Sequence, residues 1–112
     1  MSEITTHVLD VSRGRPARGI AVALERVGAP QSTMLARATT DADGRVKAFT
    51  PTPSLQVGTY RLTFEVGSYF ASAGVDAFYP RVVVEFEVRD AAQHHHVPLL
   101  LSPYGYSTYR GS

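Results

Sequence analysis

The chain has 112 residues, a formal net charge of +1, 44% hydrophobic residues and no cysteine. This length fits one domain, residues 1–112. The lack of cysteine excludes disulfides, thiolate metal ligands and thiol nucleophiles, and the balanced charge gives no nucleic-acid footprint. No apolar run reaches the roughly 20 residues of a membrane span, and the first ten residues lack the basic start and apolar stretch of a signal peptide. We therefore expect a soluble, cytoplasmic protein that binds neither nucleic acid nor membrane.

Short segments that alternate apolar and polar residues run through the chain, separated by nine glycines and seven prolines. This period of two predicts half-buried strands. In chain order the predicted strands are 4–10, 20–27, 33–40, 46–50, 59–66, 81–89, 94–101 and 104–109. The pattern is clearest in the segment 81–89, where Val82, Val84, Phe86 and Val88 share one face.

Only residues 68–75 lack this alternation, and we expect a short helix of about two turns there. No long stretch has the 3.6-residue period of an amphipathic helix. Eight short strands at this spacing indicate an all-β sandwich or barrel.

Histidines form the first candidate site. In the segment 4–10 the alternation places His7 on the face opposite Ile4 and Val8, and in 94–101 it places His94 and His96 on one face with His95 on the other. Imidazole suits proton transfer near neutral pH, although a lone histidine on a strand is usually a surface residue. His7, His94 and His96 could alternatively bind zinc.

Three further features are notable. Pro98 cannot donate a ladder hydrogen bond, so its strand should be an edge or be locally distorted. Arg45 follows the Asp43-Gly44 turn, where most arginines are solvated.

The C-terminal segment 103–112 carries three of the six tyrosines, which favours a docked tail over a frayed one. Sequence motifs of the nucleophile elbow, P-loop, dinucleotide fold and zinc protease are absent.

Three segments together resemble one known family: TTHVLD at 5–10, DADGR at 41–45 and HHHVPLLLSPYGYSTYRGS at 94–112. They are similar to the 5-hydroxyisourate hydrolases, the transthyretin-related enzymes of urate breakdown. The similarity runs from about residue 4 to residue 112. The terminal YRGS and the HVPLLLSP block are highly specific, whereas DGR alone is weak. The family commonly has tyrosine at the position of His95, which points away from the other two histidines.

The resemblance implies a transthyretin-like sandwich of two four-stranded antiparallel sheets with one short helix, assembled as a homotetramer, a dimer of dimers. It implies hydrolysis of 5-hydroxyisourate to 2-oxo-4-hydroxy-4-carboxy-5-ureidoimidazoline, without a metal or an organic cofactor. The substrate is a cyclic amide, so hydrolysis needs an activated water, a stabilised oxyanion and a proton for the departing nitrogen.

The family's site residues carry over to this chain one by one. His7, Arg45 and His96 are the expected catalytic residues: the two histidines would share the proton transfers, and Arg45 would hold the anionic edge of the substrate. The tail would bind substrate through Thr108, Tyr109, Arg110, Gly111 and Ser112.

Two competing hypotheses stay open at this stage. A ligand carrier of the transthyretin type needs an apolar channel, which the histidines and Arg45 disfavour. A zinc hydrolase built on His7, His94 and His96 needs those three side chains to meet around one metal ion.

Overall fold

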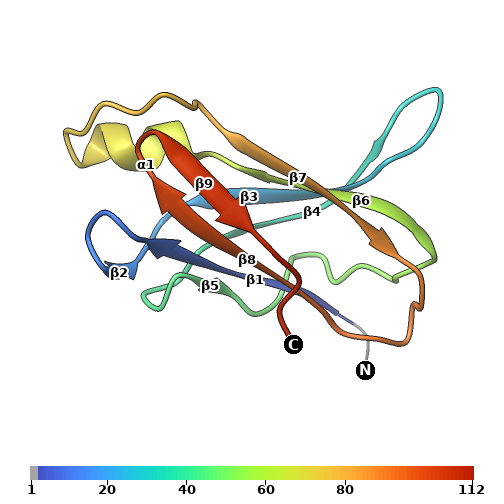
Figure 1. Ribbon diagram of the computed structural model, residues 1–112. Coiled ribbons are helices and arrows are strands. Elements are labelled where there is room, and N and C mark those ends of the chain that lie inside the picture. The colour runs from blue at the N-terminus through green and yellow to red at the C-terminus, as the bar shows by residue number, and fades with distance from the viewer. Residues whose placement is uncertain (1–2) are drawn as a thin grey trace.

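Two β-sheets packed face to face make up the protein in the computed structural model, which describes residues 3–112 (Figure 1). The first two residues of the predicted domain lie outside the described ones. The first sheet contains β1 (Ile4–Asp10), β2 (Arg15–Pro16), β5 (Arg45–Val46), β8 (His95–Ser102) and β9 (Gly105–Thr108). The second sheet contains β3 (Ala21–Arg26), β4 (Thr33–Thr39), β6 (Gly58–Phe64) and β7 (Val82–Val88). One short helix, α1 (Val66–Ser72), follows β6.

The predicted alternation decides which side chains enter the space between the sheets. Tyr60, Leu62 and Phe64 of β6 are completely buried, and Leu62 lies opposite Val84 of β7 in the antiparallel register. Burying one such side chain contributes about 1.5–3 kcal/mol. The shared face predicted for 81–89 is confirmed for β7, and the inward faces of β6 and β7 form part of the core.

The first strand has the same alternation and gives the molecule its polar outer face. Ile4, Thr6 and Val8 are buried, whereas Thr5 and His7 are half-buried on the opposite face. β1 pairs with β8 in parallel, an arrangement that sets Thr5 opposite His96 and His7 opposite Pro98. Residues that are about ninety positions apart in the chain thereby become neighbours on one surface.

The two sheets and the short helix are confirmed, but the expected strand count and direction need correction. The first sheet has five strands, in the order β2-β1-β8-β9 with β5 paired to β1, and its β1–β8 pair is parallel. The prediction for 46–50 was also too long. β5 contains only Arg45 and Val46, because the chain then turns to bury Phe49 in the core and to bridge Thr50 to Arg37 of the other sheet.

The helix begins and ends earlier than the predicted 68–75. It is anchored by Val66 and Phe70, which lie one turn apart and are both buried. Gly74 follows the helix with a φ of 71°, a left-handed conformation that a helix cannot continue through. No helix in residues 3–112 is long and apolar enough to cross a membrane.

Pro98 lies in the middle of the first sheet, so its strand is not an edge. β8 pairs with β1 on one side and with β9 on the other. The local distortion is present, however: antiparallel pairing with the C-terminal segment runs through Leu99↔Thr108, breaks next to Pro98 and resumes at His96↔Gly111. The Thr108 hydroxyl donates a 2.7 Å hydrogen bond to the Pro98 carbonyl within this break.

A buried carboxylate joins β1 to the helix. Asp10 is 1% exposed and accepts hydrogen bonds from the backbone and hydroxyl of Ser12, the backbone of Arg13 and the hydroxyl of Tyr69, the last at 2.8 Å. Burial acts to raise the pKa of Asp10, but the hydrogen bonds from Ser12, Tyr69 and Arg13 outweigh it and hold the pKa below its ordinary 3.8. The ionised form of this side chain therefore stabilises the fold.

Replacing this carboxylate should make the fold less stable and less sensitive to acid. We expect Asp10→Asn to lower the free energy of unfolding at pH 7 by about 1–3 kcal/mol, because an amide cannot accept all these hydrogen bonds. The contribution of Asp10 is fully present above its unfolded pKa and is lost as the pH falls through the lower folded value. Urea unfolding at pH 7 and pH 3 should show a larger acid loss in the wild type than in Asp10→Asn. The exposed Asp76→Asn serves as the control, and an Asp10→Asn curve that matches it would contradict the role of the network.

Candidate active site

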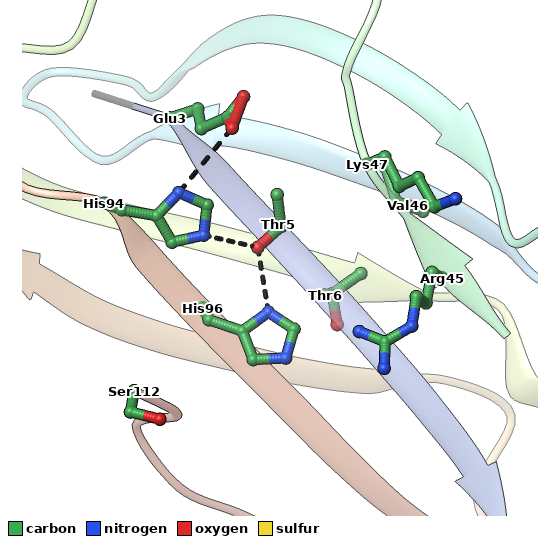
Figure 2. A pocket seen from close by; sticks show the side chains of 9 residues that line it. All are labelled: Glu3, Thr5, Thr6, Arg45, Val46, Lys47, His94, His96 and Ser112. Atoms are coloured by element: carbon green, nitrogen blue, oxygen red, sulfur yellow. Dashed lines mark hydrogen bonds and ion pairs between the residues drawn. The ribbon is translucent and has the colours of Figure 1, made fainter. Parts of the chain in front are cut away.

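A polar cleft of about 450 Å³ opens on the outer face of the first sheet, beside the start of β1 and the end of the chain (Figure 2). Two of the three expected catalytic residues line it, together with the last residue of the tail. The lining residues are Glu3, Thr5, Thr6, Arg45, Val46, Lys47, His94, His96 and Ser112. This set is rich in charged side chains and in groups that can carry protons.

A row of polar side chains crosses the cleft, and Thr5 lies at its centre (Figure 2). The Thr5 hydroxyl is 2.9 Å from Nε2 of His94 and 2.8 Å from Nδ1 of His96. The other ring nitrogen of His94, Nδ1, is 3.6 Å from a carboxylate oxygen of Glu3. The four groups form one continuous row that ends at the His96 ring.

Arg45 is placed beside this row by a tight turn. Its backbone N–H donates a 3.0 Å hydrogen bond to the Asp41 carboxylate, and this bond is the main reason that the pKa of Asp41 is lowered. Gly44 adopts a φ of 74°, and a Cβ there would collide with the Val8 carbonyl. Only glycine fits this position. The turn thus starts β5 against β1 and sends the Arg45 side chain across β1 toward His96 (Figure 2).

His96 is held in its neutral form at pH 7. Burial lowers its pKa most, and the positive charge of Arg45 lowers it further, with smaller contributions from His94 and His7. A neutral imidazole can accept a proton, which a protonated one cannot. The surroundings of His96 therefore suit a general base.

His7 does not line the cleft itself, although it lies next to it. Its side chain is half-buried on the same face as Thr5, two residues further along β1. In the sheet it is opposite Arg45 on one side and Pro98 on the other. It is close enough to His96 for its charge to lower the pKa of that ring.

The C-terminal tail is docked, but only its last residue lines the cleft. Ser112 does so, while Tyr109 and Arg110 line a second groove of about 320 Å³ between β7 and the tail. Arg110 donates hydrogen bonds to the Gln93 side chain at 3.2 Å and the His94 carbonyl at 3.4 Å. These bonds fasten the tail to the segment that enters β8.

Gly111 lies directly against the His96 ring. Its N–H donates a 2.8 Å hydrogen bond to the His96 carbonyl. A Cβ on Gly111 would lie 2.5 Å from Cδ2 of His96 and 3.2 Å from Cγ of Pro98. The tail backbone therefore forms a wall of the His96 pocket that no larger residue can replace without displacing the ring.

His95 faces away from the cleft, as the alternation predicted. It is 4% exposed, and its ring centre is 6.3 Å from that of Phe86. Burial, followed by the charge of Arg110, lowers its pKa. Within residues 3–112, its Nδ1 is the buried side-chain polar atom that has no hydrogen-bond partner.

Sequence reasoning missed Thr5, Glu3 and Lys47 as cleft residues and considered His94 only as a possible zinc ligand. The alternation of β1 already placed Thr5 on the face of His7, so this signal was available. Glu3 and Lys47 lie outside the strands they flank, and no periodic pattern points to them.

The geometry gives no support to the zinc hypothesis. Over the described part of the chain, no three His, Cys, Asp or Glu side chains come together in a way that could hold a metal ion. Thr5 lies between His94 and His96, whose ring centres are 6.4 Å apart. The zinc site of the competing hypothesis, His7 with His94 and His96, is not formed.

The fold and the cleft together define a β-sandwich protein with a polar cleft lined by histidine and arginine side chains. Residues 4–111 match the sequence model of the HIUase/Transthyretin family, and the chain belongs to this family.

The chain is similar to named hydrolases and to transthyretins. The 5-hydroxyisourate hydrolase of Caulobacter vibrioides is 47% identical over 116 residues, which cover 100% of both chains. The structure of Klebsiella pneumoniae 5-hydroxyisourate hydrolase has a TM-score of 0.86 and 42% identity over 99% of this chain and 100% of that one. Sea bream transthyretin in complex with thyroxine has a TM-score of 0.89 but only 27% identity, over 96% and 93% of the chains. The backbone is similar to that of the hydrolase and of the transthyretin, whereas the sequence is more similar to the two hydrolases.

Enlarging Gly111 should disturb His96 specifically. In Gly111→Ala we expect the His96 ring resonances to shift in a two-dimensional NMR spectrum, because the added methyl group overlaps the ring. Gly105→Ala is the matched control, since the nearest atom to its Cβ, Oγ of Ser102, is 3.7 Å away. Unchanged His96 resonances in Gly111→Ala would show that the tail backbone does not contact this ring.

Proposed function

We propose that this protein hydrolyses 5-hydroxyisourate to 2-oxo-4-hydroxy-4-carboxy-5-ureidoimidazoline in urate breakdown, as one domain over residues 1–112. The observation that carries the proposal is a neutral His96 beside Arg45 in a cleft of a chain that is 47% identical to a named 5-hydroxyisourate hydrolase. The row of polar groups that ends at His96 gives this site the means to move protons.

The reaction adds water to the C6 carbonyl of the ring amide and breaks the C6–N1 bond. The water oxygen forms the new bond to C6, one proton leaves that water, and N1 departs with a proton. The carbonyl oxygen carries negative charge in the transition state, so a base, an acid and a fixed positive charge are all required.

The cleft offers a residue for each requirement. His96 takes the proton from water because its ring is neutral, and His7, next to the same space, shares the proton transfers. Arg45 binds the anionic edge of the substrate and stabilises the charge at C6, with a guanidinium that stays charged at any working pH. The amine of Lys47 adds a second positive charge to the cleft.

The tail residues divide into two roles. The Ser112 hydroxyl lies in the cleft and can hold substrate or water. Thr108, Arg110 and Gly111 instead dock the tail, because the Thr108 hydroxyl is bonded to the Pro98 carbonyl, Arg110 to the Gln93 side chain and Gly111 to the backbone of His96. We therefore assign substrate contact to Ser112, and placement of Ser112 and His96 to these three, while substrate contact by the exposed Tyr109 stays a prediction.

Oxidising urate with a urate oxidase in the cuvette generates the substrate directly. We expect ultraviolet absorbance of 5-hydroxyisourate to decay faster when this protein is added, and the acceleration to survive excess chelator. His7→Ala, Arg45→Ala and His96→Ala should each lower kcat/KM by at least about 100-fold, the range for loss of a proton-transfer or oxyanion group.

The control for this assay is Arg61→Ala, which removes a guanidinium paired with Glu25 and Glu85 on the second sheet. It should keep wild-type kcat/KM. A loss below tenfold in His7→Ala would remove His7 from the chemistry, and acceleration abolished by chelator would contradict the metal-free mechanism. If no acceleration occurs, the hydrolase function fails, and thyroxine binding would test the carrier alternative.

We also propose that the protein works as a homotetramer, a dimer of dimers. β7 and β9 each form one edge of their sheet, and the Tyr106 ring of β9 is 5.3 Å from the ring of Tyr79, which lies three residues before β7. Next to these edges Phe78 is 69% exposed, more than the other large hydrophobic side chains of residues 3–112. Free strand edges beside exposed aromatic rings favour association with another copy.

Assembly should be required for activity, because the cleft is open and a small sandwich offers little concavity alone. Light scattering at the assay concentration should give four times the 12.2 kDa chain mass. Phe78→Glu should dissociate the tetramer and lower activity, whereas Val57→Glu, exposed on the loop before β6, should do neither. A monomer with full activity would contradict the proposal. The cytoplasmic location expected from the sequence stays a prediction.

A further inference from the structure

The row of polar groups that ends at His96 contains a hydroxyl between two imidazoles. A hydroxyl has one proton to donate and lone pairs to accept with, and each neutral imidazole has one N–H and one bare nitrogen. Thr5 is within hydrogen-bond distance of both His94 Nε2 and His96 Nδ1. The direction of one hydroxyl proton is therefore coupled to the position of the proton on each ring.

We propose that Thr5 is a positioning residue that keeps the proton of His96 on Nδ1, so that Nε2 keeps the lone pair that accepts a proton from water. This inference rests on the proposed function of His96 as the base and deepens it. In this inference Thr5 positions the proton of His96, and His94 and Glu3 act on that proton through Thr5.

The carboxylate of Glu3 determines in which direction the hydrogen bonds along this row are donated. It faces Nδ1 of His94 at 3.6 Å, and a negative charge there favours a proton on that nitrogen. Nε2 of neutral His94 is then bare and accepts the Thr5 proton. The Thr5 oxygen in turn accepts from His96, which must carry its proton on Nδ1.

If His94 donated to Thr5 and Thr5 donated to His96 instead, Nε2 of His94 would have to carry a proton. A neutral His94 would then present a bare nitrogen to the Glu3 carboxylate, an unfavourable contact of two acceptors. Donation from Nε2 of His94 would instead let Thr5 accept there and donate to His96, whose proton would then lie on Nε2 and leave that nitrogen without a lone pair for water. The charge of Glu3 disfavours this arrangement.

The other charged groups near His96 do not fix its tautomer. Arg45 and His7 face the ring and act through charge, and no hydrogen bond joins either side chain to it among the described residues. Near His94, the guanidinium of Arg110 bonds to the backbone carbonyl and leaves both ring nitrogens to Glu3 and Thr5. Thr5 is thus the side chain that contacts a nitrogen of His96 directly.

Two substitutions separate the hydroxyl from the shape of the side chain. Thr5→Val keeps the β-branched form that suits a strand and removes the hydroxyl. Thr5→Ser keeps the hydroxyl and removes only a methyl group. A structural role would be preserved in Thr5→Val, whereas the proposed role is preserved in Thr5→Ser.

The tautomer can be measured without any substrate. The chain contains four histidines, so ¹⁵N-labelled protein gives a ring spectrum in which each nitrogen can be assigned. In the wild type and in Thr5→Ser at pH 8 we expect the His96 proton on Nδ1. In Thr5→Val we expect the proton to shift toward Nε2.

Kinetics then show whether the tautomer is used. Thr5→Val should lower kcat by at least about tenfold with little change in KM, and Thr5→Ser should stay within about threefold of the wild type.

A wild-type spectrum with the His96 proton on Nε2 overturns the inference, even in an active enzyme. Wild-type kcat in Thr5→Val also overturns it. Absence of hydrolysis by the wild type is a different result: it refutes the proposed function, while the ring spectrum still decides whether Thr5 sets the tautomer.

Discussion

The parallel pairing of β1 with β8 is the constraint on which the site depends. Its register places Thr5 opposite His96 and His7 opposite Pro98, on the outer face of the first sheet. Slipping the register by one residue would turn one strand's polar set toward the core, at the expense of buried residues such as Val8 and Leu99. The same apolar packing that stabilises the sandwich therefore fixes the distances in the cleft.

Two backbone features complete what this pairing begins. The Gly44 turn brings Arg45 to β1, and the tail backbone at Gly111 closes against the His96 ring. Both depend on glycine because each position meets a neighbour that leaves no room for a Cβ. The result is an imidazole kept neutral by burial and by Arg45, and in hydrogen-bond contact with Thr5.

The sequence predicts most of the fold because apolar alternation is a local signal. The extents of β1 (Ile4–Asp10) and of β7 follow from it almost to the residue, and so does the position of His95 on the face opposite His96. The short β5 and the helix boundaries were less predictable, because tertiary packing of Phe49 and Phe70 decides them. Thr5 was not predicted as a site residue, because its role in the site depends on the pairing of its strand with another about ninety residues away.

The most direct test of the account is a titration of the protein with urate, the precursor that shares the fused ring system of 5-hydroxyisourate, followed by the histidine ring resonances. If the cleft binds this class of heterocycle, the resonances of His96 shift with increasing urate, while those of His95, buried on the opposite face, stay in place. Shifts confined to His95, or a spectrum that urate leaves unchanged, would contradict the assignment of this cleft as the active site.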